Sequence, residues 1–217
     1  MPAGAAMLLA VSAAVAAAGD SPGELSAAAW QALLAGDADA AVDRYDRLIE
    51  ARPDAAPHLW QRGIALYYAG RYADAAAQFE SHRTVNGNDI ENPVWHLLCL
   101  SRADPGGLDA ARKRMLPVGV DRRVPMSEVL DLFAGRGSIE AVERAATVNG
   151  SAEARMYADL YLGLYAEATG EAAESLRHIR RAADAPLPGH GMRQIAEAHL
   201  RFRTAAGETA DADDRSE

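Results

Sequence analysis

APHLWQRGIALYYAGRYADAAAQFESHRTVNGND, residues 56–89, decides the fold of this chain. Apolar or small side chains recur at three- and four-residue steps from Leu59 through Gly63 to Leu66. This spacing places them on one face of a helix. Gly70 follows shortly after, and glycine often ends a helix because it tolerates a left-handed backbone. The first half of the stretch therefore predicts one helix that stops at Gly70.

The second half predicts a partner helix that begins at Tyr72. Ala75 and Phe79 lie four residues apart on one face of it. Gly63 and Ala75 carry little bulk, so we expect the two helices to approach closely at this pair. Because such a helical hairpin cannot bury both of its faces alone, it needs neighbours of the same kind.

Those neighbours are present as internal repeats. A step of 34 residues back from Gly70, Ala75, Phe79 and Gly87 reaches Gly36, Ala41, Tyr45 and Pro53. A further copy near residues 157–185 carries Gly163, Gly170, Ser175, Ile179 and Ala182 in the packing positions. Between these copies Asn92-Pro93 is a typical helix start, which indicates a degenerate middle unit.

The expected architecture is an all-α solenoid of helical hairpins with a degenerate middle repeat and a C-terminal capping helix. Few β-branched residues and only three phenylalanines argue against strands. The hairpins are expected at about 22–55, 56–89, 90–117, 126–149 and 152–185, with the cap at 192–206. Together they form one domain over residues 19–206. Gly119 and Pro125 predict an irregular link at 118–125, and an acidic, disordered tail is expected at 207–217.

The first 18 residues indicate the cellular location of the protein. Residues 1–19 lack charged side chains, and a short apolar run ends in Ala16-Ala17-Ala18. This pattern is typical of a secretory signal peptide, and the run is too short to span a membrane. We therefore expect a periplasmic or secreted protein. The alternative is a cytoplasmic scaffold in which residues 1–18 form an extra helix.

Two segments carry a family resemblance. RGIALYYAGR at 62–71 and YLGLYAEATGE at 161–171, with the divergent Trp95 segment between them, resemble tetratricopeptide (TPR) repeats. Within that family they are similar to the bacterial envelope adaptors of the new lipoprotein I type. The resemblance implies a non-enzymatic periplasmic adaptor that binds proteases and cell-wall hydrolases. The chain lacks the lipid-bearing cysteine of that family, so no membrane association is expected.

A partner is expected along the concave face, which the first helix of each TPR hairpin lines. Aromatic side chains offer a large contact area at low entropic cost, which favours peptide recognition. The alternative is that the N-terminal helix or a second copy of the chain in a homodimer covers these side chains. The expected groove is formed by Trp30, Leu33, Leu34, Trp60, Ile64, Tyr67 and Tyr68.

The sequence offers no catalytic motif. The formal net charge of −9 argues against a nucleic-acid ligand, and the cluster from Arg112 to Arg123 is interpreted as solvated. The single cysteine, Cys99, lies in an apolar run and is expected in the core. His190 and His199 come nearest to a metal pair, but a turn residue and a packed helix residue explain them better. We expect no enzyme, cofactor or metal; a hydrolase with an unrecognised site is the remaining alternative.

Overall fold

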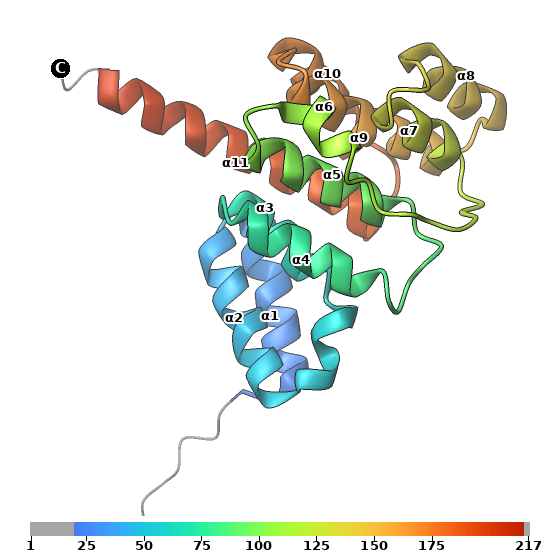
Figure 1. Cartoon of the computed structure of the whole chain (residues 1–217). Coiled ribbons are helices and arrows are strands. Elements are labelled where there is room, and N and C mark those ends of the chain that lie inside the picture. The colour runs from blue at the N-terminus through green and yellow to red at the C-terminus, as the bar shows by residue number, and fades with distance from the viewer. Residues whose placement is uncertain (1–19, 215–217) are drawn as a thin grey trace, which may run out of the picture.

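The computed structural model describes the backbone of residues 20–214 and the side chains of residues 20–204. Within this part the chain is all-helical, without a strand, and consecutive helices pack on one another (Figure 1). None of the described helices is both long and apolar enough to cross a membrane. The helices are α1 Pro22–Ala35, α2 Ala38–Ala51, the 3-10 helix η1 Pro53–His58, α3 Trp60–Tyr68, α4 Tyr72–His82, α5 Glu91–Ala103, α6 Gly107–Arg112, α7 Met126–Phe133, α8 Ile139–Asn149, α9 Ala152–Ala168, α10 Ala172–Ala183 and α11 Gly191–Asp214.

Three hairpins share one turn geometry. The pairs α1–α2, α3–α4 and α9–α10 are each joined by two or three residues that include a glycine. Gly36, Gly70 and Gly170 have φ values of 89°, 73° and 87°. This left-handed backbone strains any side chain with a Cβ, which is why glycine recurs there. The expectation of an all-α array of helical hairpins is therefore confirmed at the level of a helical repeat fold.

Side-chain caps mark the starts of both helices of the N-terminal hairpin. The hydroxyl of Ser21 accepts a hydrogen bond from the Glu24 backbone, and the Glu24 carboxylate accepts one from the Ser21 backbone. This reciprocal capping box satisfies two donors that a helix start leaves unpaired. The Asp37 side chain caps α2 in the same manner by accepting from the backbone of Ala40.

The close approach within the hairpins involves a side chain that was not singled out for this contact from the sequence. A Cβ placed on Gly63 would lie 2.7 Å from the ring of Phe79. Gly163 meets Ile179 at the same distance in the last hairpin. Both pairs lie sixteen residues apart in the sequence. In both hairpins a glycine thus lies opposite a large buried side chain, which fills the space that glycine leaves because it has no side chain.

This packing makes Gly63 intolerant of a side chain. We expect Gly63→Val to lower the free energy of unfolding by about 2 kcal/mol, because overpacking a tight core forces neighbours to shift. Phe79 is only 1% exposed and has little room to move. The matched control is Gly23→Val on α1, where an added Cβ meets open space. Urea denaturation of both variants checks this, and equal stabilities would contradict the packing argument.

The C-terminal helix reaches further than the expected cap. It packs on α9 and α10, as predicted, and it also contacts α1 at the other end of the array. Figure 1 shows it passing behind α5 toward the N-terminal hairpins. Its end at Asp214 lies beyond the expected boundary at residue 206, so the first residues assigned to a tail belong to the helix. The helix therefore packs on the last repeat, where the cap was expected, and also on the first hairpin.

The middle of the chain is irregular, as its degenerate repeat suggested. Between α6 and α7 the backbone runs from residue 113 to 125 without a helix, which includes the predicted link at 118–125. Two details differ from expectation. η1 was not predicted, and Asn92 does not cap α5, because that helix begins at Glu91 with Ile90 at the cap position. Residues 1–18, expected to be a signal peptide, lie outside the described residues.

Candidate functional site

Of the seven residues expected to form the groove, three are buried in the core. Leu33 and Ile64 are fully buried and Tyr67 is 4% exposed. The remaining four, Trp30, Leu34, Trp60 and Tyr68, are partly buried. Trp30 and Trp60 contact each other edge to face, with their ring centroids 5.9 Å apart. The structure therefore places three of the seven residues in the core and leaves four partly exposed, and partner binding along this strip stays a prediction.

The chain's own C-terminal helix covers this strip. The ring of Tyr68 stacks on Phe202 of α11 at a centroid distance of 4.2 Å, and the Tyr68 hydroxyl lies 2.9 Å from Nδ1 of His199. Arg201 donates a hydrogen bond to the backbone oxygen of Leu34. The sequence left open whether the N-terminal helix or a second copy covers these side chains. Trp60 does contact Trp30 of the N-terminal helix α1, and α11 adds a cover over Tyr68 that the sequence did not indicate.

A cavity of about 290 Å³ lies beside the covered strip. One side comes from α3, α4 and α5, and the other comes from α9 and the start of α11. Aromatic rings from four helices form its walls, which are Trp60, Phe79, Trp95 and Tyr157. Trp60 is the one residue of the expected groove that lines it. Its size is at the lower end of the range for small-molecule sites.

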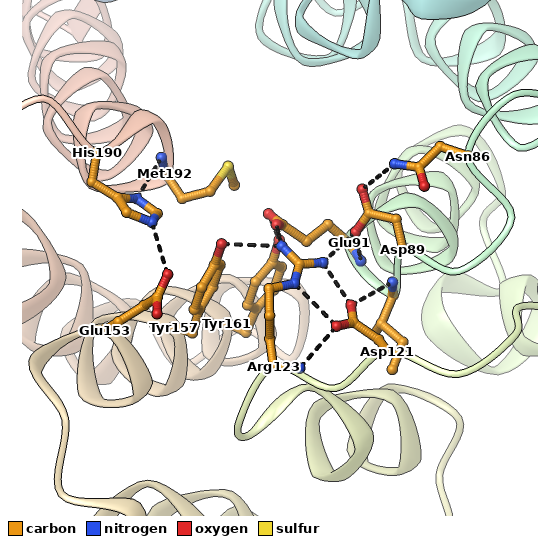
Figure 2. Close-up of polar contacts among 11 residues, drawn as sticks. Asn86, Asp89, Glu91, Asp121, Arg123, Glu153, Tyr157, Tyr161, His190 and Met192 are labelled. Atoms are coloured by element: carbon orange, nitrogen blue, oxygen red, sulfur yellow. Dashed lines mark hydrogen bonds and ion pairs between the residues drawn. The ribbon is translucent and has the colours of Figure 1, made fainter.

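Arg123 organises the rim of the cavity (Figure 2). A guanidinium group has five N–H donors. Nε and Nη2 donate to the two oxygens of Asp121, Nη2 also donates to Asp89, and Nη1 donates to Glu91 and to the Tyr157 hydroxyl. All five donors are therefore used within the protein. Arg123 holds the loop before α7 against α5 and α9, and it has no donor left for an incoming anion.

The carboxylates around Arg123 are similarly occupied. Glu91 also accepts a hydrogen bond from the Tyr161 hydroxyl at 2.6 Å, and Asp89 accepts from the side chain of Asn86. Burial raises the pKa of Glu91, the charge of Asp89 adds to this rise, and Arg123 opposes it. The pKa of Asp121 is lowered, because hydrogen bonds from Arg123 outweigh the effect of its burial. The hydrogen bonds of this network hold the rim in place and occupy the polar groups that a ligand could otherwise bind.

Three side chains that line the cavity each carry a buried polar atom without a protein partner among the described residues. These atoms are Nε2 of His82, Oδ1 of Asn92 and Nε1 of Trp95. The three side chains that carry them all line the cavity and are at most 5% exposed. A buried polar atom without a hydrogen bond costs about 1–3 kcal/mol. These three atoms therefore mark the cavity as a place where a polar ligand would gain hydrogen bonds.

Local geometry brings the three atoms to one place. Phe79 and His82 are one turn apart on α4, and Asn92 and Trp95 are one turn apart on α5. The Asn92 amide donates to the backbone oxygen of Phe79 at 3.0 Å, which ties the two helices together there. The ring of Phe79 stacks on Trp95 with centroids 6.4 Å apart. Residues separated by one turn share a helix face, so the side chains converge on the cavity.

The start of α11 completes the site. His190, Gly191 and Met192 line the cavity opposite the aromatic walls. The His190 ring accepts a hydrogen bond from the Met192 backbone, and its other nitrogen lies 3.4 Å from Glu153 (Figure 2). A Cβ added to Gly191 would meet open space. The helix that covers the aromatic strip thus also contributes one wall of the cavity.

The lining of the cavity holds several titratable side chains, among them His82, Asp89, Glu91, Tyr157 and His190. It contains no serine, threonine, cysteine or lysine that could act as a nucleophile. Cys99 is buried away from it, and burial raises the pKa of its thiol. Among the described residues no group of three or more histidine, cysteine or acidic side chains could hold a metal ion. No protein-family model matches the chain.

Sequence reasoning missed most of this site. Arg123 was grouped with solvated arginines, and its neighbours Asp89, Glu91 and Tyr157 are distant in the sequence. The available signal was local, since Asp89-Ile-Glu91-Asn92 places three polar residues at the start of an apolar helix. His82 is the last residue of α4, and its Nδ1 lies 2.8 Å from the Pro57 backbone oxygen.

Proposed function

We propose that this protein is a non-enzymatic helical-repeat scaffold of the TPR type that binds a protein or peptide partner. The support is the recurrence of glycine-turned hairpins, together with the TPR-like segments at 62–71 and 161–171. The binding site is the cavity at Trp60, His82, Asn92 and Trp95, into which a terminus or a side chain of the partner inserts. The observation that carries this choice is the set of three unpaired buried polar atoms.

The cavity is a better candidate than the aromatic strip because of what each offers a partner. Leu33 and Ile64 have no exposed surface, so a partner could reach them only after α11 detached. Detachment would cost the contacts of Tyr68 with His199 and Phe202. The cavity needs no such opening, and its polar atoms provide the specificity that an apolar strip lacks.

The proposed location is the cell envelope. It rests on residues 1–18, which have the pattern of an export signal and lie outside the described residues. A cytoplasmic scaffold is the alternative location. Cell fractionation combined with N-terminal sequencing of the native protein separates the two, since export predicts cleavage near Ala18.

Filling the cavity tests the proposed site. Gly191→Leu adds a side chain at a cavity position where a Cβ meets open space, so the fold should tolerate it. We expect the variant to lose at least one protein that the wild type retains in affinity purification from the source cell, as identified by mass spectrometry. The physical reason is that the leucine occupies the volume that the partner's inserted group needs.

The matched control is Gly23→Leu on the exposed surface of α1, which should retain the same proteins as the wild type. Thermal unfolding of both variants verifies that neither has lost its fold. Identical sets of retained proteins for the wild type and a folded Gly191→Leu would contradict the cavity as the partner site.

A further inference from the structure

We propose that the cavity binds a primary ammonium group that has a hydrogen-bond-accepting oxygen close to it and an apolar body, which is the chemistry of a peptide's free amino terminus. This inference rests on the proposed function and names the part of the partner that enters. It follows from the hydrogen-bonding character of the three unpaired atoms, from the charges around them and from the aromatic walls.

Two of the three atoms are acceptors. His82 Nδ1 lies 2.8 Å from the Pro57 carbonyl oxygen, which can only accept, so Nδ1 carries the proton. In the neutral ring Nε2 is then a lone-pair acceptor. The Asn92 amide nitrogen donates to the backbone of Phe79, so its Oδ1 is the second acceptor. An ammonium group supplies donors for both.

The third atom needs a hydrogen-bond acceptor on the ligand. The indole nitrogen of Trp95 can only donate, so it requires an acceptor on the ligand. Trp95 lies one turn from Asn92 on α5, which sets the required acceptor close to the ligand's donors. A peptide amino terminus has this arrangement, because the first carbonyl oxygen lies two bonds beyond the carbon that carries the ammonium group. A simple alkylamine lacks it.

The charges at the rim favour a cation over an anion. Arg123 is the only arginine or lysine among the lining residues, and its five donors are used. Three carboxyl groups, those of Asp89, Glu91 and Asp121, surround this single guanidinium. An anionic ligand would therefore find carboxylates without a free cationic donor, and like charges at such a distance repel.

The walls suit an ammonium group and the body behind it. The faces of Trp60 and Trp95 carry partial negative charge, which attracts cations. The same rings bury apolar surface. The volume of about 290 Å³ limits the inserted body to a small group. One terminal residue of a peptide is the size that this argument predicts.

Three small probes test the ligand class by isothermal titration calorimetry with the full chain. L-phenylalaninamide carries the ammonium group, the neighbouring carbonyl and an apolar body. N-acetyl-L-phenylalaninamide differs by the blocked amine, and 3-phenylpropionate replaces the cation by an anion. We expect phenylalaninamide to bind with a dissociation constant of about 1 mM or below, and both other probes to bind at least about tenfold more weakly. Equal affinity for the acetylated probe would overturn the inference, as would the absence of binding by all three.

Two peptide arms identify the source of the ammonium group. A hexapeptide that begins with phenylalanine and has a free amino terminus should bind more tightly than phenylalaninamide, and the same peptide with an acetylated terminus should not bind. If phenylalaninamide binds and the free peptide does not, the source is a small free amine and the peptide terminus is ruled out.

Variants verify that binding occurs in the cavity. Trp95→Phe removes the indole donor together with part of the buried ring, so its fold is checked by thermal unfolding. It should weaken phenylalaninamide binding at least about fivefold, the value of one hydrogen bond. Gly191→Leu should abolish binding, and Gly23→Leu should leave it unchanged. Unaltered affinity in folded Gly191→Leu would place the ligand elsewhere and overturn the inference.

The two proposals can fail separately. If the acetylated probe binds as well as the free amine, and Gly191→Leu still loses its partner, then the cavity is the site and the ammonium class is wrong. If Gly191→Leu retains every partner and also binds no probe, the cavity binds the amine but is not where the protein partner docks.

Discussion

Replacing Arg123 with methionine is expected to lower the free energy of unfolding by about 3 kcal/mol at neutral pH. The variant keeps the apolar stem and removes the five donors that hold Asp89, Glu91 and Asp121. Removing one partner of a buried ion pair typically costs about 3–5 kcal/mol, because the other charge remains unpaired. The lower end applies here because the Arg123 side chain is one-third exposed. Urea denaturation monitored by circular dichroism measures the loss.

The pH dependence of this loss identifies its cause. Burial raises the pKa of Glu91, and removing Arg123 takes away the charge that opposes this rise. A group with a raised folded pKa stabilises the fold at low pH and loses that stabilisation as pH rises through the folded value. The difference between Arg123→Met and the wild type should therefore shrink from pH 7 to pH 5. A constant difference would indicate lost packing rather than unpaired charge.

The neighbouring arginine provides the control for this experiment. Arg122 is exposed, so Arg122→Met should change stability by less than about 0.5 kcal/mol. Arg123→Lys should recover only part of the loss, because an ammonium group has three donors and cannot match the planar fork of a guanidinium. Full recovery by lysine would contradict the five-donor description.

The second large effect is expected at His199, whose stability contribution should depend on pH. Burial, and then the charge of Arg102, lower the pKa of His199 to about 4. Glu167 lies 3.2 Å from its Nε2, but Arg102 and Arg203 already share that carboxylate. An unfolded histidine has a pKa of about 6.5. The unfolded chain therefore takes up a proton first as pH falls, which destabilises the fold.

Linkage gives the size of this effect. Between pH 7 and pH 5 the difference between the two pKa values removes about 2 kcal/mol of stability. The variant His199→Gln retains a polar group that can contact Tyr68 but does not titrate, so its stability should fall by about 2 kcal/mol less over the same range. Equilibrium unfolding at pH 5, 6 and 7 measures both profiles.

Exposed His58 supplies the control, since His58→Gln should follow the wild-type profile. Parallel profiles for His199→Gln and the wild type would contradict the buried, neutral state of His199. They would also weaken the description of Tyr68, His199 and Phe202 as the contacts that fasten α11 over the N-terminal hairpins.

Local features of the fold were predictable because their causes are close in the sequence. The capping box at Ser21 and Glu24 fixes the start of α1, and left-handed glycines at 36, 70 and 170 fix the hairpin turns. Cys99 was expected in the core from the apolar run around it and is fully buried. In each case a few neighbouring residues determine the backbone or the burial, so no distant contact is required.

The cavity and the cover over the aromatic strip depend on distant residues. Tyr68 and His199 are separated by 131 positions, and Glu91 and Tyr161 by 70. A periodic pattern indicates that Tyr68 lies on an apolar face, but it does not indicate which surface covers that face. The same pattern describes a binding strip and a strip that the chain buries itself, so the sequence could not show that Phe202 of α11 packs on Tyr68.

The sequence by itself determined that the chain folds into helical hairpins, where most of the helices begin and end, and that its glycines set the turns. The tertiary structure alone decided that α11 returns to α1, that Arg123 lies among three carboxyl groups, and that His82, Asn92 and Trp95 face one cavity. The physical reason is that helix formation depends on interactions within about four residues, whereas covering an apolar face depends on which distant surface fits it best.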